Sequence, residues 1–277
     1  MMTKTHPPNL NPKIALSMID RFLQEELGKT GLKGVVLGLS GGVDSALASA
    51  LAVHALGPER VLAVKMPYRT SSPASEADAD AVIAHLGVHA DRVDITPMVD
   101  AYFDGVPDAS PLRRGNFMAR VRMSVLFDRS ARESYLVLGT SNKTELLLGY
   151  GTWYGDMASS LNPIGDLYKA QVWQLARHMG LPESVVSKPP SADLWPDQTD
   201  EGEMGLSYAE ADAILCLMVD ERYTVEEVAA AGHPLPLVQK VLGMVEGSQF
   251  KRRLPIIAKL SGRTVGIDFR YPRDWGR

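Results

Sequence analysis

The residues best suited to chemistry lie near the amino end, in the segment Leu37–Ala46 with the sequence LGLSGGVDSA. Gly41 and Gly42 allow the backbone to approach a polyanion closely, and their N–H groups followed by a helix start form an anion-binding concavity. The Asp44 carboxylate would repel a phosphate directly, but it suits a Mg²⁺ ion that bridges to phosphate oxygens. The segment differs from the Walker loop because no lysine follows the glycines. It therefore predicts a loop that holds nucleotide phosphates together with a divalent cation.

Alternating strands and helices must position this loop. Short apolar runs rich in β-branched residues predict strands, and longer Ala/Leu-rich or helically spaced runs predict helices. The strands are expected at 34–39, 60–66, 89–95 and 135–139, and the helices at 12–28, 46–56, 76–86, 116–134 and 169–180. This alternation predicts an α/β fold with a doubly wound, mostly parallel sheet. Ligands of such sheets bind at the carboxyl ends of the strands, where residues 40–45 and 140–145 fall.

The chain changes character after Gly180. Residues 187–207 are polar and contain several prolines, short helices are expected at 208–220, 224–231 and 235–246, and residues 247–277 form a basic tail. We therefore expect one domain over residues 1–277. Its α/β nucleotide-binding core would span 12–186, and its small C-terminal extension would span 187–277 with a mobile loop, helices and the tail.

Composition excludes several classes of protein. The 277 residues carry a net charge of −4, which argues against a nucleic-acid backbone as the main partner, despite a helix-turn-helix outline at 224–246. The single cysteine, Cys216, excludes an internal disulfide and a cysteine-based zinc site, and it is expected in the core. The amino end lacks the features of a secretory signal, and no apolar run approaches the ~18–20 residues of a membrane span. We expect neither a nucleic-acid nor a membrane partner, and a cytoplasmic location.

The string SGGVDS resembles the signature of the PP-loop ATPases, also called N-type ATP pyrophosphatases. This resemblance implies a Rossmann-like fold of the adenine-nucleotide α-hydrolase-like kind. It also implies ATP binding, release of pyrophosphate and an adenylated intermediate. The motif alone does not choose among the members of that superfamily.

Later segments resemble ammonia-dependent NAD synthetase in order and spacing. The strings that carry this likeness are Gly115–Asn116 with Ala119–Arg120, then Val137–Glu145 (VLGTSNKTE), Tyr154–Asp156 (YGD), Pro163–Lys169 (PIGDLYK) and Lys188–Trp195 (KPPSADLW). The likeness covers roughly residues 12–275, nearly the whole chain. It implies a ligase that amidates deamido-NAD with ammonia in an ATP- and Mg²⁺-dependent reaction, giving NAD, AMP and pyrophosphate.

The resemblance also implies roles for individual residues. The metal ligands would be Asp44 and Glu145, and Lys169 would offset charge on the leaving pyrophosphate. The residues implied to contact ATP are Gly38, Leu39, Ser40, Gly41, Gly42, Val43, Asp44, Ser45, Thr140, Lys169 and Ser191. The residues implied on the deamido-NAD side are Arg120, Trp153, Ser160 and Lys251. Because ammonium must lose a proton before it attacks, we hypothesise that Asp156 performs this task.

Three positions on the deamido-NAD side depart from the family pattern. Trp153 stands where a lysine is common, Ser160 where an acidic residue is common, and Phe250 where a histidine often precedes the lysine. Because all three departures lie on the deamido-NAD side, the resemblance supports the ATP chemistry better than it supports the identity of the second substrate. We hypothesise that Trp153 stacks on the nicotinate ring or lines its pocket.

The resemblance implies two further partners. Relatives of this type are homodimers, so a second copy of the chain is expected. The glutamine-dependent branch carries a glutaminase domain before the synthetase part, and no such domain fits in 277 residues. We therefore expect the chain to take free ammonia or ammonia from a separate glutaminase.

Two other functions stay open at the level of sequence. One is another PP-loop ATP pyrophosphatase that amidates or thiolates a different substrate. The other is a non-catalytic regulator that binds a nucleotide. The pair Asp44 and Glu145 argues against the regulator, because a simple binder has no need of a metal-assisted leaving group.

Overall fold

A four-stranded parallel sheet forms the centre of the computed structural model, which describes residues 7, 9–191 and 199–269. The strands are β1 (Gly34–Gly38), β2 (Val61–Lys65), β3 (His89–Arg92) and β4 (Tyr135–Val137), in the order β3-β2-β1-β4. In register, Val36 of β1 pairs with Leu62 of β2 and with Val137 of β4. The predicted parallel α/β fold is confirmed. The strand order reverses between β1 and β4, which is where ligands bind in open sheets of this kind.

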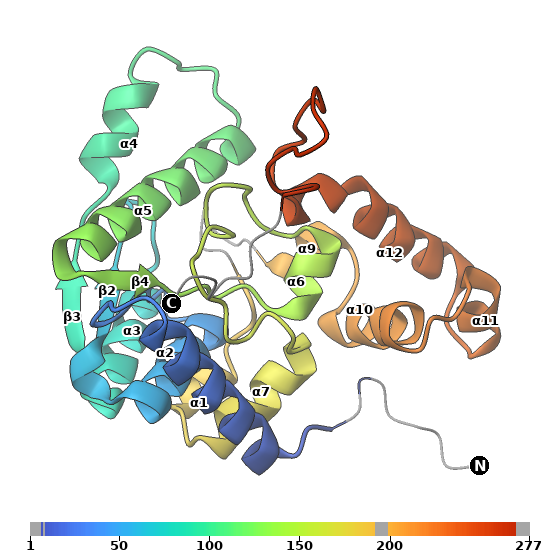
Figure 1. Cartoon of the computed structure of the whole chain (residues 1–277), viewed down its shortest axis with the longest axis horizontal. Helices are drawn as coiled ribbons and strands as arrows, with labels where there is room; N and C mark the ends of the chain where they lie inside the picture. Colours follow the sequence, from blue (N-terminus) through green and yellow to red (C-terminus); the bar gives the residue numbers. More distant parts are fainter. Residues whose placement is uncertain (1–6, 8, 192–198, 270–277) are drawn as a thin grey trace.

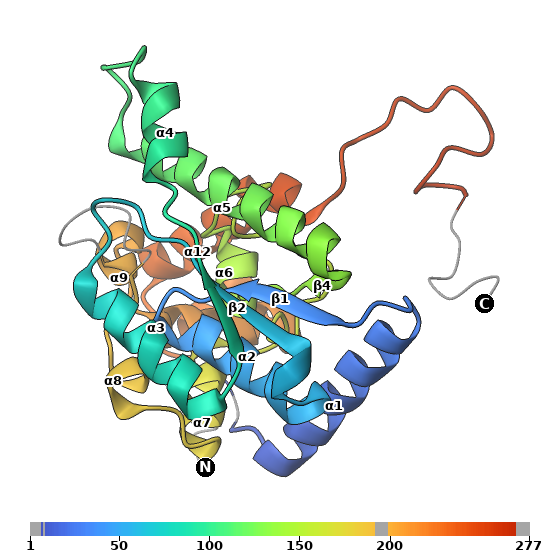
Figure 2. The same cartoon turned by 90° about the vertical axis from the view of Figure 1, so that its left-hand side faces the viewer.

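Helices cover both faces of the sheet (Figures 1 and 2). Successive residues of a strand point to opposite faces, so Val35 and Leu37 pack into one core cluster and Val36 packs into another. The first cluster includes α1 (Pro12–Gly28), α2 (Val43–Leu56), α3 (Pro73–Leu86), α7 (Lys169–His178) and α8 (Glu183–Val186). The second includes α4 (Thr96–Phe103) and α5 (Pro111–Glu133).

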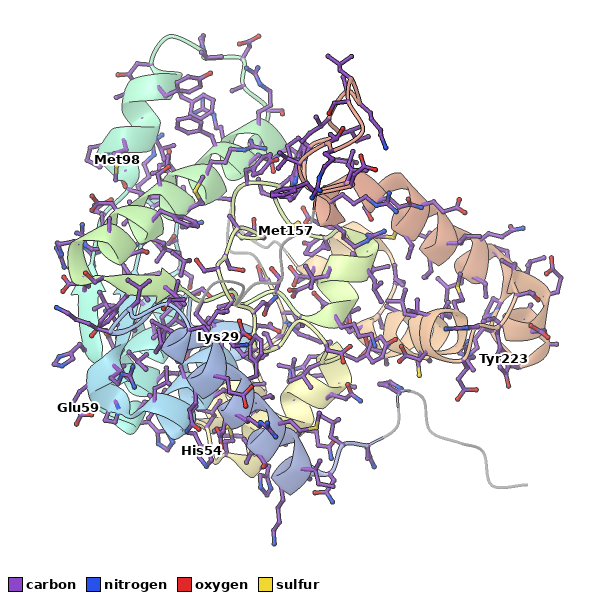
Figure 3. The ribbon with its side chains drawn as sticks, in the orientation of Figure 1. Lys29, His54, Glu59, Met98, Met157 and Tyr223 are labelled. Atoms are coloured by element: carbon purple, nitrogen blue, oxygen red, sulfur yellow. The ribbon has the colours of Figure 1, made fainter. Side chains whose placement is uncertain are left out.

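The helix after β1 is apolar almost all round because it lies in the middle of its layer. Most of its side chains are buried, and it packs against the sheet, α1 and α7. By contrast, α1 buries only Leu23 and Leu27 fully and leaves Met18 exposed. Figure 3 shows the side chains on the ribbon, and His54 at the end of α2 lies at the surface and pairs with Asp20 at 2.9 Å.

A second group of helices packs beside the sheet layers (Figure 1). It consists of α10 (Tyr208–Leu215), which continues as a π-helical turn (Cys216–Asp220), α11 (Val225–Ala230) and α12 (Leu235–Gly247). These helices share a core cluster that includes Cys216, which is buried as expected. Helix α10 contacts α6 (Lys143–Leu148) and α7, and α12 contacts α6. The division of the domain at residue 186 stays a prediction.

After α12 and a short 3₁₀ turn (Gln249–Arg252), the described chain leaves the body of the protein. Figure 2 shows this segment extending away from the helices, and it exposes Leu254, Ile256 and Leu260. Among the described residues, no helix is long and apolar enough to cross a membrane.

Several element bounds differ from the sequence expectation. The sequence predicts no helix between residues 95 and 116, but α4 begins at Thr96, because a proline suits its first turn and Val99 and Phe103 reach the core. Helix α5 begins at Pro111, before the expected start at residue 116, and the Ser110 hydroxyl accepts from Arg113 N there. Another helix, α9 (Asp200–Met204), lies inside the expected loop 187–207. The element after β1 begins at Val43, so Asp44 lies in the first helical turn.

Candidate active site

A cavity of about 780 Å³ lies at the carboxyl ends of β1, β2 and β4. Its walls come from the loop after β1, the starts of α3 and α7, one side of α5, residues 149–158, residues 188–191 and Lys251. The volume is in the range of pockets that hold small-molecule and cofactor ligands. The cavity thus occupies the position where the strand order reverses, as the parallel sheet predicts.

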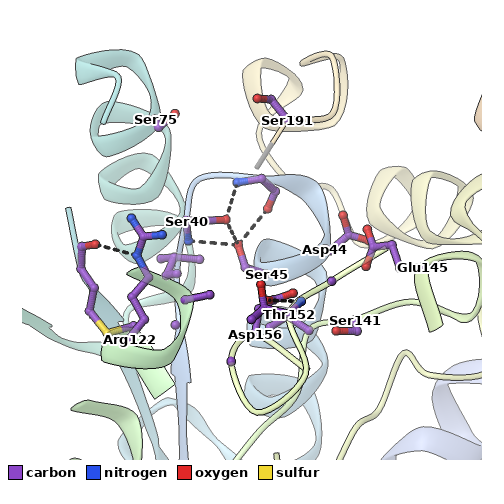
Figure 4. A pocket seen from close by; sticks show the side chains of 18 of the residues that line it. Ser40, Asp44, Ser45, Ser75, Arg122, Ser141, Glu145, Thr152, Asp156 and Ser191 are labelled. Atoms are coloured by element: carbon purple, nitrogen blue, oxygen red, sulfur yellow. Dashed lines mark hydrogen bonds between the residues drawn. The ribbon is translucent and has the colours of Figure 1, made fainter. Parts of the chain in front are cut away.

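The glycine-containing loop forms one wall of the cavity and is braced by its own serines (Figure 4). The Ser45 hydroxyl donates to the Gly42 carbonyl at 3.0 Å and accepts from the Ser40 backbone N–H at 3.2 Å. The Gly42 N–H donates to the Ser40 hydroxyl at 3.3 Å. These bonds fix the loop before any ligand arrives, which lowers the entropy lost on binding an anion.

Gly41 has a different role from its neighbour, because it does not line the cavity. Its φ is +81°, and a Cβ there would lie 2.2 Å from the backbone carbonyl oxygen of Ser75. The start of α3 therefore packs directly against the loop. Only glycine combines this backbone conformation with so close an approach.

Three ionisable groups meet at the centre of the cavity. Asp44 follows β1, Glu145 lies in α6 after β4, and Lys169 begins α7. The Lys169 ammonium pairs with Asp44 and lies 3.7 Å from Glu145 Oε1. Figure 4 shows the carboxyl groups of Asp44 and Glu145 side by side. The sequence prediction that two strand ends bring these acids together agrees with this arrangement.

Asn142 orients both acids. Its side-chain amide donates to Asp44 Oδ1 at 2.8 Å, and its side-chain oxygen accepts from the Glu145 N–H at 3.0 Å. The Glu145 carboxylate in turn accepts from the Asn142 N–H at 3.1 Å, which completes a capping box at the start of α6. Asn142 is itself buried, so the geometry of the pair is set by the protein.

The three groups shift one another's pKa values. Burial and the neighbouring Asp44 raise the pKa of Glu145 to about 8. Burial works to lower the pKa of Lys169, but the carboxylates of Asp44 and Glu145 outweigh it and raise that pKa above its ordinary value. Lys169 therefore stays charged, although it is only 1% exposed.

A second polar group lies where residues 149–156 meet the start of the tail. The Lys251 ammonium donates to the carbonyls of Gly149 and Gly151 at 2.7 and 2.8 Å. The Asp156 carboxylate accepts from the Thr152 N–H at 2.8 Å. Asp156 is exposed to the cavity, but desolvation by the protein around it raises the pKa of its carboxyl group. Both Lys251 and Asp156 line the cavity, as expected.

The other residues expected on the substrate side lie outside the cavity wall. Arg120, Trp153 and Ser160 do not line it. The Trp153 ring stacks on Tyr154 with centroids 4.3 Å apart and meets Phe250 edge-on at 5.4 Å, while Arg120 donates to the Trp153 carbonyl at 3.3 Å. Trp153, Tyr154 and Phe250 are next in sequence to the cavity-lining residues Thr152, Gly155 and Lys251, respectively.

The remaining residues expected to contact ATP line the cavity, namely Gly38, Leu39, Ser40, Gly42, Val43, Ser45, Thr140 and Ser191. Trp195, in the string after Ser191, lies outside the described residues.

Sequence reasoning missed several cavity residues. Lys188 lines the wall and donates to Ser75 Oγ at 3.1 Å and Asp78 Oδ2 at 2.8 Å. Its place in the KPPSADLW string was the available signal. Asp200 also lines the cavity and accepts hydrogen bonds from the hydroxyls of Tyr150 and Tyr208. No local sequence pattern indicates this role.

Comparison with known proteins decides the family. The model of the NAD synthase family matches residues 15–255. The chain belongs to the NAD synthase family. It is 61% identical to an NH(3)-dependent NAD(+) synthetase of Trichlorobacter lovleyi, over 97% of this chain and 98% of that protein. The resemblance inferred from the sequence is confirmed.

Solved structures agree with this assignment to the NAD synthase family. The NH3-dependent NAD synthetase of Campylobacter jejuni superposes with a TM-score of 0.78 at 34% identity, over 90% of this chain and 100% of that one. An NMN synthetase from Francisella tularensis gives a TM-score of 0.81 at 29% identity, over 90% and 99% of the two chains. The fold is thus the one that NAD synthetases share.

The two loop glycines give a matched test of the site geometry. We expect Gly41→Ala to lower the free energy of unfolding by more than about 2 kcal/mol, because it combines a left-handed backbone with a backbone clash. We expect Gly42→Ala to cost less than about 1 kcal/mol, because its φ is −88° and a Cβ would meet only the Ser40 hydroxyl at 3.4 Å. Urea unfolding of both variants without nucleotide measures the difference. Equal losses would contradict the packing of α3 against the loop.

Proposed function

We propose that this chain joins ammonia to the carboxylate of deamido-NAD at the expense of ATP, giving NAD, AMP and pyrophosphate, and that the described cavity is where this happens. One observation carries the proposal: Asp44, Glu145 and Lys169 converge beside a braced glycine loop in a member of the NAD synthase family. A carboxylate is a poor electrophile, so the reaction needs a better leaving group than oxide. Transfer of AMP to the carboxylate supplies it.

In the first step, a carboxylate oxygen of deamido-NAD attacks the α-phosphorus of ATP and the bond to pyrophosphate breaks. The backbone N–H groups in the first turn of α2, at Val43, Asp44 and Ser45, would bind the departing phosphates. Lys169 lies beside the loop's Asp44 and places a fixed positive charge where negative charge builds up.

Asp44 and Glu145 would hold Mg²⁺. Magnesium is commonly bound by one or two carboxylates that share it with substrate phosphates, so the pair fits this ion. When bound, the ion would neutralise charge on the phosphates.

In the second step, ammonia attacks the adenylated carbonyl carbon, the bond to AMP breaks, and the amide forms. Ammonium first gives up a proton, and we assign this proton to the Asp156 carboxylate. Desolvation by the surrounding protein supports the role, because it raises the pKa of Asp156 and so makes the carboxylate a better base. Water takes the second proton that the attacking nitrogen loses.

The second substrate would reach the cavity past the aromatic cluster. Trp153, Tyr154 and Phe250 offer ring faces and edges for a nicotinate ring, and Arg120 and Ser160 would bind polar parts of the dinucleotide. Lys251, fixed by two carbonyls, would face its phosphates. A second copy of this chain would be its partner in a homodimer, as the resemblance implies.

A direct assay tests the function. The purified chain is incubated with ATP, Mg²⁺ and ammonium, with and without deamido-NAD, and NAD and AMP are quantified. We expect equal amounts of the two products, and neither without deamido-NAD. Formation of AMP without NAD would point to another acceptor and would contradict the proposal.

Metal dependence gives a second test. We expect EDTA to abolish NAD formation and Mg²⁺ to restore it. Asp44→Asn should lower kcat at least about 100-fold and raise the Mg²⁺ concentration for half-maximal rate, because a ligand and a charge are lost. Asp128→Asn, which removes an exposed acid on α5, is the control and should behave like the wild type. An unchanged Mg²⁺ requirement in Asp44→Asn would exclude Asp44 as a ligand.

The proton acceptor can be tested separately. We expect Asp156→Asn to lower kcat/KM for ammonium about 100-fold or more at pH 7, the range typical of a lost general base. The deficit should shrink as the pH rises, because bulk water then supplies ammonia already deprotonated. Initial rates at low ammonium across this pH range measure the effect. If Asp156→Asn keeps full activity at low ammonium and pH 7, another group takes the proton.

A further inference from the structure

The two helices that carry Glu145 and Lys169 begin side by side. The Lys143 N–H at the start of α6 donates to the Leu167 carbonyl at 2.8 Å. The Lys169 N–H at the start of α7 donates to the Thr144 hydroxyl at 3.0 Å. Thr144 directly precedes Glu145, so this bond connects the main chain of Lys169 to the residue before Glu145.

Asp212 holds both helix starts from behind. It lies on α10, and its side chain is 0% exposed. One carboxylate oxygen accepts from the Thr144 hydroxyl at 2.5 Å, and the other accepts from the Ala170 N–H at 2.8 Å. These partners are 68 and 42 residues away in the sequence. Asp212 does not line the cavity.

The bonds leave little freedom at the Thr144 hydroxyl. Its single proton goes to Asp212, and a lone pair of its oxygen accepts the Lys169 N–H. Helix α7 has no acidic residue in its own first turn, so the Asp212 carboxylate also supplies the negative charge that a helix start favours. Burial raises the pKa of Asp212 to about 6, while these bonds act to lower it.

Helix α10 also contacts the other end of Lys169. Tyr208 lies one turn before Asp212, so both side chains are on one face of α10. The Tyr208 ring centroid is 4.9 Å from the Lys169 ammonium, and its hydroxyl donates to Asp200 at 3.0 Å. Helix α10 therefore contacts the main chain next to Lys169 through Asp212, and the Lys169 ammonium through Tyr208.

We propose that Asp212 is a positioning residue, which sets the placement of Lys169 and Glu145 through its bonds to Ala170 and Thr144. Asp212 touches no substrate. This role rests on the proposed function for its kinetic consequences, but the placement itself is a property of the protein alone. It gives helix α10 a part in placing the ionisable groups of the cavity.

Thr144 provides a matched pair of variants. Thr144→Val keeps the size of the side chain but removes the hydroxyl, whereas Thr144→Ser keeps the hydroxyl and removes a methyl group. We expect Thr144→Val to lower kcat for NAD formation about 10- to 100-fold with little change in KM for ATP, since misplacement of about 1 Å can cost a factor of ~100. Thr144→Ser should retain most of kcat. The reverse order would show that Thr144 acts by packing, and would overturn the proposal.

Asp212→Asn tests the carboxylate itself. We expect it to lower kcat about 10- to 100-fold as well. The double variant with Thr144→Val should have a kcat little below that of the worse single variant, because both changes break the same hydrogen-bonded connection between Asp212 and Thr144. Val228→Ala is the control, since Val228 is a fully buried residue of the same helical core. It should lower the melting temperature and leave kcat unchanged below it. The proposal would be contradicted if the fold-losses in kcat of the two single variants multiplied in the double variant. It would also be contradicted if Val228→Ala lost as much kcat as Asp212→Asn.

Crystal structures of Asp212→Asn and Thr144→Val separate this inference from the proposed function. We expect the Lys169 ammonium to shift from its place 3.7 Å from Glu145 Oε1. An unchanged arrangement in both variants would overturn the inference, whatever the wild type catalyses. A wild type that forms no NAD would overturn the proposed function, while a shifted Lys169 would still support the positioning role.

Discussion

The burial of one ammonium between two carboxylates is the constraint on which this structure depends. Lys169 is 1% exposed, and an isolated charge at such depth costs several kcal/mol unless partners surround it. Its partners come from different strand ends, Asp44 after β1 and Glu145 after β4. The cluster therefore exists only if these strands are parallel neighbours. The sheet order β3-β2-β1-β4 meets this condition and opens the cavity at the same point.

The net charge of the same cluster suits a ligand that brings both a cation and phosphates. With both carboxyl groups ionised, two negative charges face one ammonium, and a divalent cation would reverse the sign of that excess. Burial and the neighbouring Asp44 raise the pKa of Glu145, because its negative charge lies in a desolvated position beside a second one. A triphosphate and its metal would thus complete the electrostatics of the site, while the serine-braced loop is already in place.

The strand-loop-helix around SGGVDS has its own signals, so the strand and the glycine loop could be predicted, although the helix begins at Val43 and not at residue 46. A parallel sheet also places Asp44 and Glu145 at neighbouring strand ends, so their approach could be predicted as well. Contacts between distant helices could not. Helix α4 was missed because its Thr-Pro start also fits a turn, and only burial of Phe103 decides for a helix. Asp212 was missed because its partners are 42 and 68 residues away. No periodicity along α10 shows which buried polar residue meets another helix.

A crystal structure with Mg²⁺ and an ATP analogue that cannot be cleaved at the α-phosphate would test whether Asp44, Glu145 and Lys169 bind the triphosphate of ATP. We expect phosphates against the glycine loop and the first turn of α2, and the metal between the two carboxylates. We also expect the Lys169 ammonium to turn from Asp44 toward a phosphate oxygen. A nucleotide bound elsewhere, or a metal that leaves both carboxylates uncoordinated, would contradict it.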